Sequence, residues 1–267
     1  MTLIDGIPAD VVSANDRGLL YGDGVFRTLK RAEGVSLYWA RQYRKLVADC
    51  AALHLSCPAA AVLEADLERL PRDCVAKIIV TRGLAARGYA VLPDALPTRI
   101  VTSSPLPLYP RSHYTMGVKV HLCGLRLASQ PRLAGIKHLN RLENVLARME
   151  WDDPAIAEGL LLDAAGDVIE GTMSNVFCYR AGVLHTPDLS CCGVAGVQRE
   201  RMLEFAAESG MAVRVGKLPL DRLMEAEEIM LCNSVIGVWP VREFNGRVWD
   251  KGGVAVRLRQ LMEDRDD

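Results

Sequence analysis

Residues Ala134–Met149, AGIKHLNRLENVLARM, place one lysine directly before a stretch with helical periodicity. Gly135 lies just before Lys137, and a His-Leu-Asn turn follows it. Beyond the turn, apolar residues recur at the spacing of an amphipathic helix: Leu139, Leu142, Val145, Leu146 and Met149. The pattern predicts Lys137 at a strand end or in a loop before a helix, where a rigid element holds a reactive side chain and leaves its tip accessible. A solvated surface lysine is the alternative, because lysines are mostly exposed.

Length and composition are those of an ordinary globular protein. The 267 residues suffice for one large or two medium domains, each with its own core. A net charge of -1 with both signs interspersed argues against nucleic-acid or membrane-surface binding as the main activity. No apolar run reaches the roughly 20 residues that span a bilayer, and MTLIDGIPAD lacks the basic and apolar segments of a secretory signal. We expect a cytoplasmic protein.

The eight cysteines favour buried thiols over a metal or disulfide framework. They are scattered, and no C-x-x-C pair occurs in the sequence. His121-x-Cys123 comes nearest to a metal motif, but it lacks the second spaced pair of a zinc site. We therefore expect no metal, and most thiols should act as small buried hydrophobes in a reducing compartment.

Turn signals and periodicity predict a mixed α/β fold. The elements expected first are a hairpin within residues 2–12 around Asp5-Gly6, a hairpin at Leu29–Tyr38 around Glu33-Gly34, helices at Trp39–Leu53 and Ala59–Leu70, and strands at Val75–Thr81 and Thr98–Ser103. Pro105, Pro107 and Pro110 cannot continue a helix or a central strand. We expect an N-terminal domain at 1–104, a proline-rich linker at 105–115 and a second domain at 116–267.

The second domain carries polar residues at two places of chemical interest. Its expected elements are a strand at Gly117–Cys123, two or three strands within 158–185, a helix within Gly193–Gly210 and the apolar run Ile229–Ile236. Glu170 follows two apolar residues at a strand end, and it is either solvated or functional. The helix start at Gly196-Val197-Gln198 offers backbone N–H groups and a dipole suited to a phosphate.

The run Ile136–Glu143, IKHLNRLE, resembles the lysine segment of the fold-type IV pyridoxal 5'-phosphate (PLP) enzymes. That family holds branched-chain and D-amino-acid aminotransferases and aminodeoxychorismate lyases, and KHLNR is most similar to the lyase branch. Further segments are similar to the same family: YGDGVFRTL, TRG with RGY, VIEGTMSN and GVAGVQ. The chain departs from the family at Arg27, where glutamate is frequent, and at Gln198, where a hydroxyl residue is frequent.

The resemblance implies roles for particular residues. Lys137 would carry PLP covalently and act as the catalytic residue, and Glu170 would pair with the ring nitrogen and keep it protonated. The remaining cofactor-binding residues would be Arg44, Asn175, Val197, Gln198, Asn233 and Ser234. The substrate-binding residues would be Thr28, Arg82, Arg87, Tyr89 and Tyr109. The implied fold has two domains, a smaller N-terminal α/β sandwich and a larger C-terminal pseudo-barrel, and the implied assembly is a homodimer.

Three functions remain open on the sequence. The first is a PLP-dependent carbon–oxygen lyase that acts on 4-amino-4-deoxychorismate in folate biosynthesis. The second is a D-amino-acid or branched-chain aminotransferase, which shares the lysine, glutamate and phosphate segments. The third is a non-catalytic metal or thiol protein that uses the cysteines. KHLNR favours the first over the second.

Overall fold

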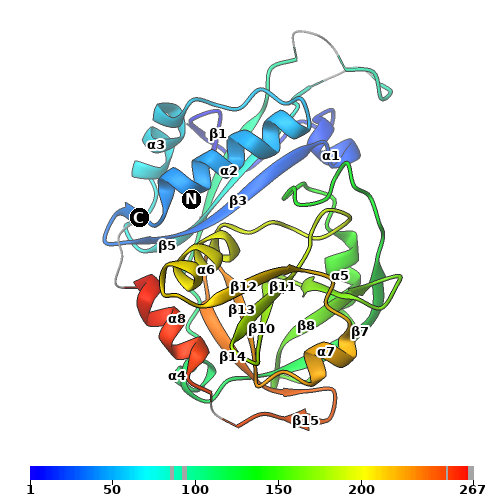
Figure 1. The fold of residues 1–267 in the computed structure, drawn as a ribbon. Coiled ribbons are helices and arrows are strands. Elements are labelled where there is room, and N and C mark those ends of the chain that lie inside the picture. The colour runs from blue at the N-terminus through cyan, green and yellow to red at the C-terminus, as the bar shows by residue number, and fades with distance from the viewer. Residues whose placement is uncertain (85–86, 92–94, 251, 264–267) are drawn as a thin grey trace. The chain divides into compact units, whose positions relative to one another are not determined.

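A computed structural model describes residues 1–84, 87–91, 95–250 and 252–263 (Figure 1). The chain forms two compact units. The first comprises Met1–Pro107 together with Ile136–Asn140, and the second comprises Leu108–Gly135 and the chain from Arg141 onward. The lysine segment therefore belongs to the first unit although it lies in the middle of the sequence of the second. Among the described residues, no helix is both long and apolar enough to cross a membrane.

The first unit is an antiparallel six-stranded sheet in the order β2-β1-β6-β5-β3-β4. Its elements are β1 Thr2–Ile4, β2 Ile7–Pro8, α1 Arg17–Tyr21, β3 Gly24–Ala32, β4 Val35–Ser36, α2 Trp39–Ala52, α3 Ala60–Glu68, β5 Cys74–Thr81 and β6 Arg99–Ser104. Helices α2 and α3 cover one face, and Leu46, Cys50, Leu63 and Leu67 fill the core beneath them (Figure 1).

Turn chemistry explains the two hairpins of this sheet. Asp5 and Gly6 have φ values of 50° and 82°, and Glu33 and Gly34 have 53° and 88°. Consecutive left-handed residues give a turn whose twist matches that of the strands it joins. Both predicted hairpins are confirmed, as are the helices predicted at Trp39–Leu53 and Ala59–Leu70, with ends shifted by one or two residues.

Alternation along β3 sends its side chains to two different environments. Val25, Arg27 and Leu29 point to the buried face under the helices. Phe26 and Thr28 lie on the other face and are only half-buried. An arginine thus occupies a core-facing position in the middle of an apolar set.

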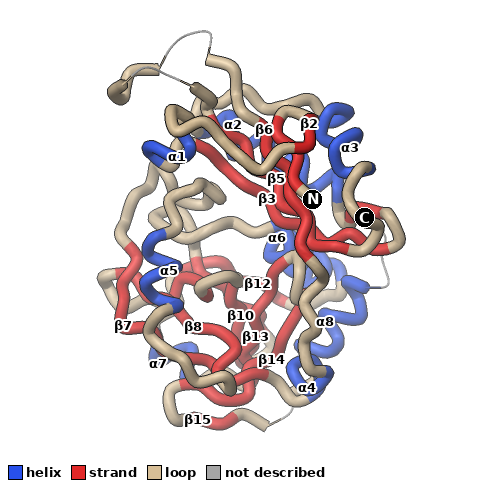
Figure 2. Tube along the Cα trace, turned by 180° about the vertical axis from the view of Figure 1, so that it is seen from behind, coloured by secondary structure: helices blue, strands red, loops and turns tan. Residues whose placement is uncertain are grey.

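The second unit is a mixed nine-stranded sheet, whose main path runs β12-β11-β10-β13-β14-β7-β8-β9 with β15 paired to β14. Its strands are β7 Val118–Leu127, β8 Ile156–Asp163, β9 Val168–Gly171, β10 Asn175–Arg180, β11 Val183–Pro187, β12 Ala212–Gly216, β13 Glu228–Asn233, β14 Gly237–Phe244 and β15 Arg247–Val248. Its helices are α4 Arg111–Thr115, α5 Leu142–Arg148, α6 Val197–Glu208, α7 Leu220–Met224 and α8 Val254–Glu263. Helix α5 lies beside β7 and β8, whereas α6 and α8 pack against each other and against β13 (Figure 2). The mixed α/β class predicted from the sequence is confirmed.

The helix predicted after the lysine is present as α5. It begins at Leu142, because Leu139 still donates its backbone N–H to the carbonyl oxygen of Gly24 at 3.0 Å. Its apolar stripe does not join the core of the unit: Leu142, Val145, Leu146 and Met149 are 52–74% exposed. Only the small Ala147 of α5 is buried.

The segment expected as a linker also contains regular structure. Residues 111–115 form α4, which starts directly after Pro110. Proline is well tolerated beside the first turn of a helix, because the first N–H groups lack partners there. The prolines therefore end the extended segment and begin a helix.

Candidate active site

Lys137 lies at the edge of the first unit's sheet. The backbone N–H of Phe26 donates to the Lys137 carbonyl oxygen at 2.9 Å, and His138 forms an antiparallel bridge with Val25. The segment thus extends the sheet at the end of β3 that β4 leaves open. The predicted position of Lys137, at a strand end or in a loop before a helix, is confirmed.

The Lys137 ammonium lies over an aromatic ring on the half-buried face of the sheet. Its Nζ is 4.6 Å from the centroid of the Phe26 ring, and the Nζ of Lys77 is 4.7 Å from the same centroid. Thr28 shares this face with Phe26 and pairs with Lys77 in the register of β3 and β5. Lys77 was not predicted as a site residue, although a lysine inside the apolar strand VAKIIV is a signal that could have identified it.

The backbone of Lys137 is held from the helix side by a carboxylate. Asp49 Oδ2 accepts from the Lys137 N–H at 3.3 Å and from Arg27 Nη1 at 3.1 Å, and Asp49 Oδ1 accepts from Lys45. Asp49 is 1% exposed and Arg27 is 3% exposed. Burial lowers the pKa of the Arg27 guanidinium, and the charge of Asp49 opposes that shift. The only sequence signal for this network was an aspartate on the apolar face of α2.

Arg44 occupies a different side of α2 from this network. It is exposed, whereas its neighbour Lys45 is half-buried and pairs with Asp49 one turn later. Lys45 is linked to the lysine segment through Asp49, which also accepts from the Lys137 N–H. The phosphate-binding role of Arg44 stays a prediction.

The arginines predicted for the substrate differ in what they bind. Arg82 bonds both oxygens of Asp23 at 2.8 and 3.0 Å and the carbonyl oxygens of Leu53 and His54 at 2.8 and 2.7 Å. The Arg82 guanidinium therefore bonds to groups within the first unit. Arg87 is exposed and leaves its guanidinium accessible. Sequence reasoning missed the buried Arg17, which bonds the carbonyl oxygens of Gly88, Tyr89 and Ala90 and so holds the loop that carries Tyr89.

The second unit builds a polar cluster at the ends of β9 and β10. Glu170 is 3% exposed, and its Oε2 accepts from the backbone N–H of Val194 at 2.8 Å. Asn175 bonds to the same segment, residues 194–196. Its Nδ2 donates to the Val194 carbonyl oxygen at 2.7 Å, and its Oδ1 accepts from Gly196 N–H at 3.2 Å. The two predicted residues are thus brought together on one segment, which leads directly into α6.

The start of α6 fits a phosphate. No described residue supplies an acceptor to the backbone N–H of Val197 or Gln198, and no side chain caps the helix at Gly196. A Cβ at Gly196 would collide with Asn175 Oδ1, so only glycine permits this close approach. Free N–H groups at the start of a helix of 12 residues favour an anion. The Gln198 side chain is engaged elsewhere, because its Oε1 accepts from Arg201 at 3.3 Å.

Asn233 and Tyr109 have structural contacts of their own. Asn233 Oδ1 accepts from the N–H groups of Val235 and Ile236 at 2.8 and 2.9 Å, and its Nδ2 donates to the Met173 carbonyl oxygen at 3.0 Å. These bonds form a turn at the end of β13, and half-buried Ser234 lies within the turn. The Tyr109 ring packs edge-on against Trp239 at 4.8 Å, and burial raises the pKa of its hydroxyl.

Glu158 is a buried carboxylate that sequence reasoning missed. It is 1% exposed and accepts from Gly159 N–H, from the N–H and hydroxyl of Thr172, and from Met173 N–H and Ser174 hydroxyl. Burial raises its pKa, against the lowering effect of these hydrogen bonds. Glu158 thereby fixes the loop between Glu170 and Asn175. The sequence pattern AEGLLLD marks it only as a charge before a buried run.

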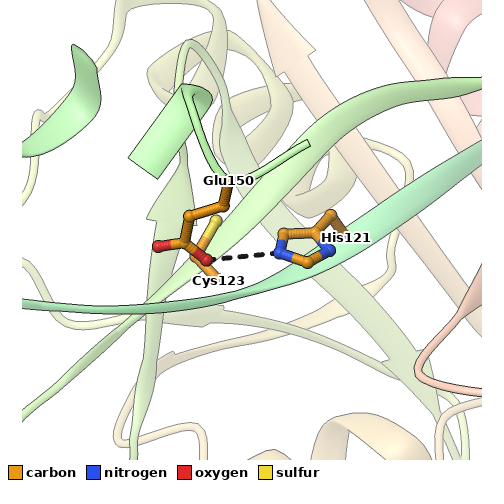
Figure 3. Close-up of side chains that lie close together, drawn as sticks. All are labelled: His121, Cys123 and Glu150. Carbon is orange, nitrogen blue, oxygen red and sulfur yellow. Dashed lines mark hydrogen bonds and ion pairs between the residues drawn. The ribbon is translucent and has the colours of Figure 1, made fainter. Parts of the chain in front are cut away.

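The predicted near-motif His121-x-Cys123 gains a third member in Glu150 (Figure 3). One ligand atom from each residue lies within 4.8 Å of the others. Glu150 accepts from His121 Nε2 at 3.2 Å and from the N–H groups of Gly124 and Leu125 at 2.5 and 2.9 Å. These bonds give an acceptor to two backbone N–H groups in an irregular stretch of β7, where the register of β7 against β8 shifts. Burial raises the pKa of the Cys123 thiol to about 12, which disfavours the thiolate form that binds metal ions.

A family model of class IV amino-transferases matches residues 24–244. Because this match covers most of the sequence, the chain belongs to the class IV amino-transferase family. Enzymes of this family use PLP. Free N–H groups such as those at the start of α6 suit its phosphate. A buried carboxylate such as Glu170 suits its ring nitrogen, and a lysine such as Lys137 suits its aldehyde.

Within the family, the chain is similar to enzymes named as lyases. It is 35% identical over 244 residues to the aminodeoxychorismate lyase of Vibrio harveyi, covering 90% of both chains. The crystal structure of 4-amino-4-deoxychorismate lyase from Pseudomonas aeruginosa has a TM-score of 0.96 and 44% identity, with 100% of both chains covered. A putative branched-chain-amino-acid aminotransferase of Methanocaldococcus jannaschii is 30% identical over 262 residues, 96% of this chain and 90% of that protein. The Escherichia coli branched-chain aminotransferase shares the fold, with a TM-score of 0.86 at 20% identity.

Proposed function

We propose that this protein is a PLP-dependent lyase that converts 4-amino-4-deoxychorismate to 4-aminobenzoate and pyruvate, a reaction of folate biosynthesis. The observation that carries the proposal is the 44% identity to the Pseudomonas aeruginosa lyase over the whole of both chains. The segment IKHLNRLE, whose lysine lies at an ordered sheet edge, supports the same conclusion.

Lys137 is the catalytic residue in this proposal. PLP, when bound, supplies an electron sink for the negative charge that develops on the substrate carbon. The Lys137 amine removes the proton from the carbon that bears the amino group. Enolpyruvate then leaves with its ether oxygen and takes a proton on its methylene carbon to become pyruvate, and the ring that remains is aromatic. In the structure, the Lys137 Nζ lies 4.6 Å from the centroid of the Phe26 ring, which borders the space open to the side chain.

Other residues hold the cofactor and the substrate. Glu170 keeps the ring nitrogen protonated, and the N–H groups of Val197 and Gln198 bind the phosphate, with Asn175 fixing the turn before them. Arg44, Asn233 and Ser234 complete the proposed phosphate set. Thr28, Arg87, Tyr89 and Tyr109 are the proposed substrate contacts, because Thr28 shares the face of the Lys137 ammonium and Arg87 and Tyr89 are exposed. Arg82 is the weakest member, since four of its five N–H donors bond to Asp23, Leu53 and His54.

We also propose a cytoplasmic homodimer. The apolar stripe of α5, formed by Leu142, Val145, Leu146 and the C-cap residue Met149, is exposed. Exposed apolar patches mark interaction surfaces. A second copy of the chain would cover this stripe through a self-complementary contact. Its leucine, valine and methionine side chains suit such an apolar interface.

A branched-chain or D-amino-acid aminotransferase is the second candidate, and the 30% identity to the Methanocaldococcus jannaschii protein favours it. The two functions are separated by incubating the PLP-loaded protein with single amino acids and no second substrate. An aminotransferase converts the cofactor to its pyridoxamine form, which absorbs differently, and releases one 2-oxo acid per site. We expect no such stoichiometric conversion. Borohydride reduction followed by peptide mapping then locates the cofactor, and a label on any lysine other than Lys137 would overturn the assignment.

A further inference from the structure

We propose that Asp49 is a positioning residue for Lys137 and that the buried Arg27–Asp49 pair exists to hold it there. The proposal rests on the function proposed above for Lys137. It concerns the chain's departure from the family at Arg27, to which no role attaches in the lyase chemistry.

The Lys137 backbone is held by two hydrogen bonds within the first unit. Its carbonyl oxygen accepts from Phe26 N–H at 2.9 Å, and its N–H donates to Asp49 Oδ2 at 3.3 Å. The first bond holds the peptide group that follows the Lys137 Cα, and the second holds the peptide group that precedes it. Neither group can rotate without breaking its bond. The direction in which Lys137 leaves the backbone is thereby set.

Two basic residues hold the Asp49 carboxylate in its position. Its Oδ2 also accepts from Arg27 Nη1 at 3.1 Å, and its Oδ1 accepts from Lys45. Arg27 is buried, and its Nε has no hydrogen-bond partner among the described residues. A buried carboxylate without cations would be strongly unfavourable, and the two basic residues prevent that.

Stability alone does not account for such a pair. Buried ion pairs are often replaced by apolar residues of similar volume without loss of stability. An apolar replacement would keep the core filled, but it would not give the Lys137 N–H an acceptor. Asp49 supplies that acceptor, and an apolar side chain in its place would not.

Two double variants separate the acceptor from the charges. R27Q/D49N removes both charges and retains an amide oxygen for Lys137 N–H and a donor in place of the guanidinium. R27M/D49L also removes both charges, but leaves Lys137 N–H without an acceptor. A small displacement of a reacting group costs on the order of 100-fold in rate, so we expect R27M/D49L to lower kcat by about 10- to 100-fold and leave KM within about threefold. R27Q/D49N should stay within about fivefold of the unaltered protein.

Two further readouts do not depend on turnover. The pH midpoint of the absorbance change of the lysine-bound cofactor should move in R27M/D49L and not in R27Q/D49N. Hydrogen exchange of the Lys137 N–H in the unaltered protein without cofactor should be slowed by at least about tenfold relative to an unstructured peptide, as expected for a bonded amide. An unprotected Lys137 N–H overturns the proposal even if a variant fails to fold.

The outcomes also separate this proposal from the proposed function. Cofactor attached at Lys137, together with equal kcat and equal spectral midpoints in the two double variants, overturns the role of Asp49 and leaves the lyase standing. Absence of cofactor from Lys137 in the unaltered protein overturns both.

Discussion

Replacing Glu158 by alanine should destabilise the protein strongly and loosen the loop between Glu170 and Asn175. The carboxylate is 1% exposed and accepts from three backbone N–H groups, those of Gly159, Thr172 and Met173, besides two hydroxyls. The hydroxyls can turn to other acceptors, but the N–H groups cannot. Each buried donor left without a partner costs about 1–3 kcal/mol. Thr172 N–H retains a bond to the Gly159 carbonyl oxygen, so we expect a loss of about 3–5 kcal/mol in the free energy of unfolding.

Urea unfolding followed by circular dichroism measures this loss. With a slope of about 3 kcal/mol per molar urea, a loss of about 3 kcal/mol lowers the midpoint by about 1 M. Glu225→Ala is the matched control, because Glu225 forms an exposed ion pair with Arg180 at 2.7 Å and such pairs contribute less than about 1 kcal/mol. A Glu158→Ala midpoint equal to that of the control would refute the reasoning, and so would unaltered PLP affinity.

Three other predictions concern separate parts of the molecule. Burial raises the pKa of Asp23, but hydrogen bonds and charge from Arg82 and Arg17 outweigh burial and lower that pKa. The ionised Asp23 should therefore stabilise the fold above its unfolded-state pKa, and this contribution should disappear as the pH falls through its folded-state pKa. Thermal unfolding measured against pH should show a smaller loss of stability in acid for Asp23→Asn, and an unchanged pH dependence contradicts this. Gly196→Ala should weaken PLP binding about tenfold or more in a fluorescence titration, because the Cβ of the new alanine would displace Asn175 Oδ1 from the turn before α6. An affinity equal to that of the unaltered protein would show that the turn has room for the Cβ. Leu146→Glu should shift the protein to monomer in analytical ultracentrifugation, since it places a charge in the α5 stripe; an unchanged mass would remove α5 from the interface.

Local signals in the sequence predicted much of the fold and the outline of the site. Asp5-Gly6 and Glu33-Gly34 predicted their hairpins because two adjacent residues determine the turn. The position of Lys137 followed from the break between two periodic segments. The resemblance to a family then pointed to Glu170 and Asn175, which the structure brings together on one segment.

Pairings between distant residues could not be predicted in the same way. Arg27 and Asp49 are 22 residues apart, and nothing in either local pattern indicates a partner. Glu158 and Ser174 meet only through the register of β8 and the turn after β9. The helical spacing of Leu142 and Leu146 predicted an apolar face correctly, but periodicity does not say whether the chain's own core covers that face.

The lyase activity itself is tested most directly by its products. PLP-loaded protein is supplied with 4-amino-4-deoxychorismate and no 2-oxo acid, with Lys137→Ala in parallel, and 4-aminobenzoate and pyruvate are followed together. We predict equal amounts of both products from the unaltered protein and neither from the variant. A protein that visibly holds PLP at Lys137 and yields neither product would contradict the proposed function.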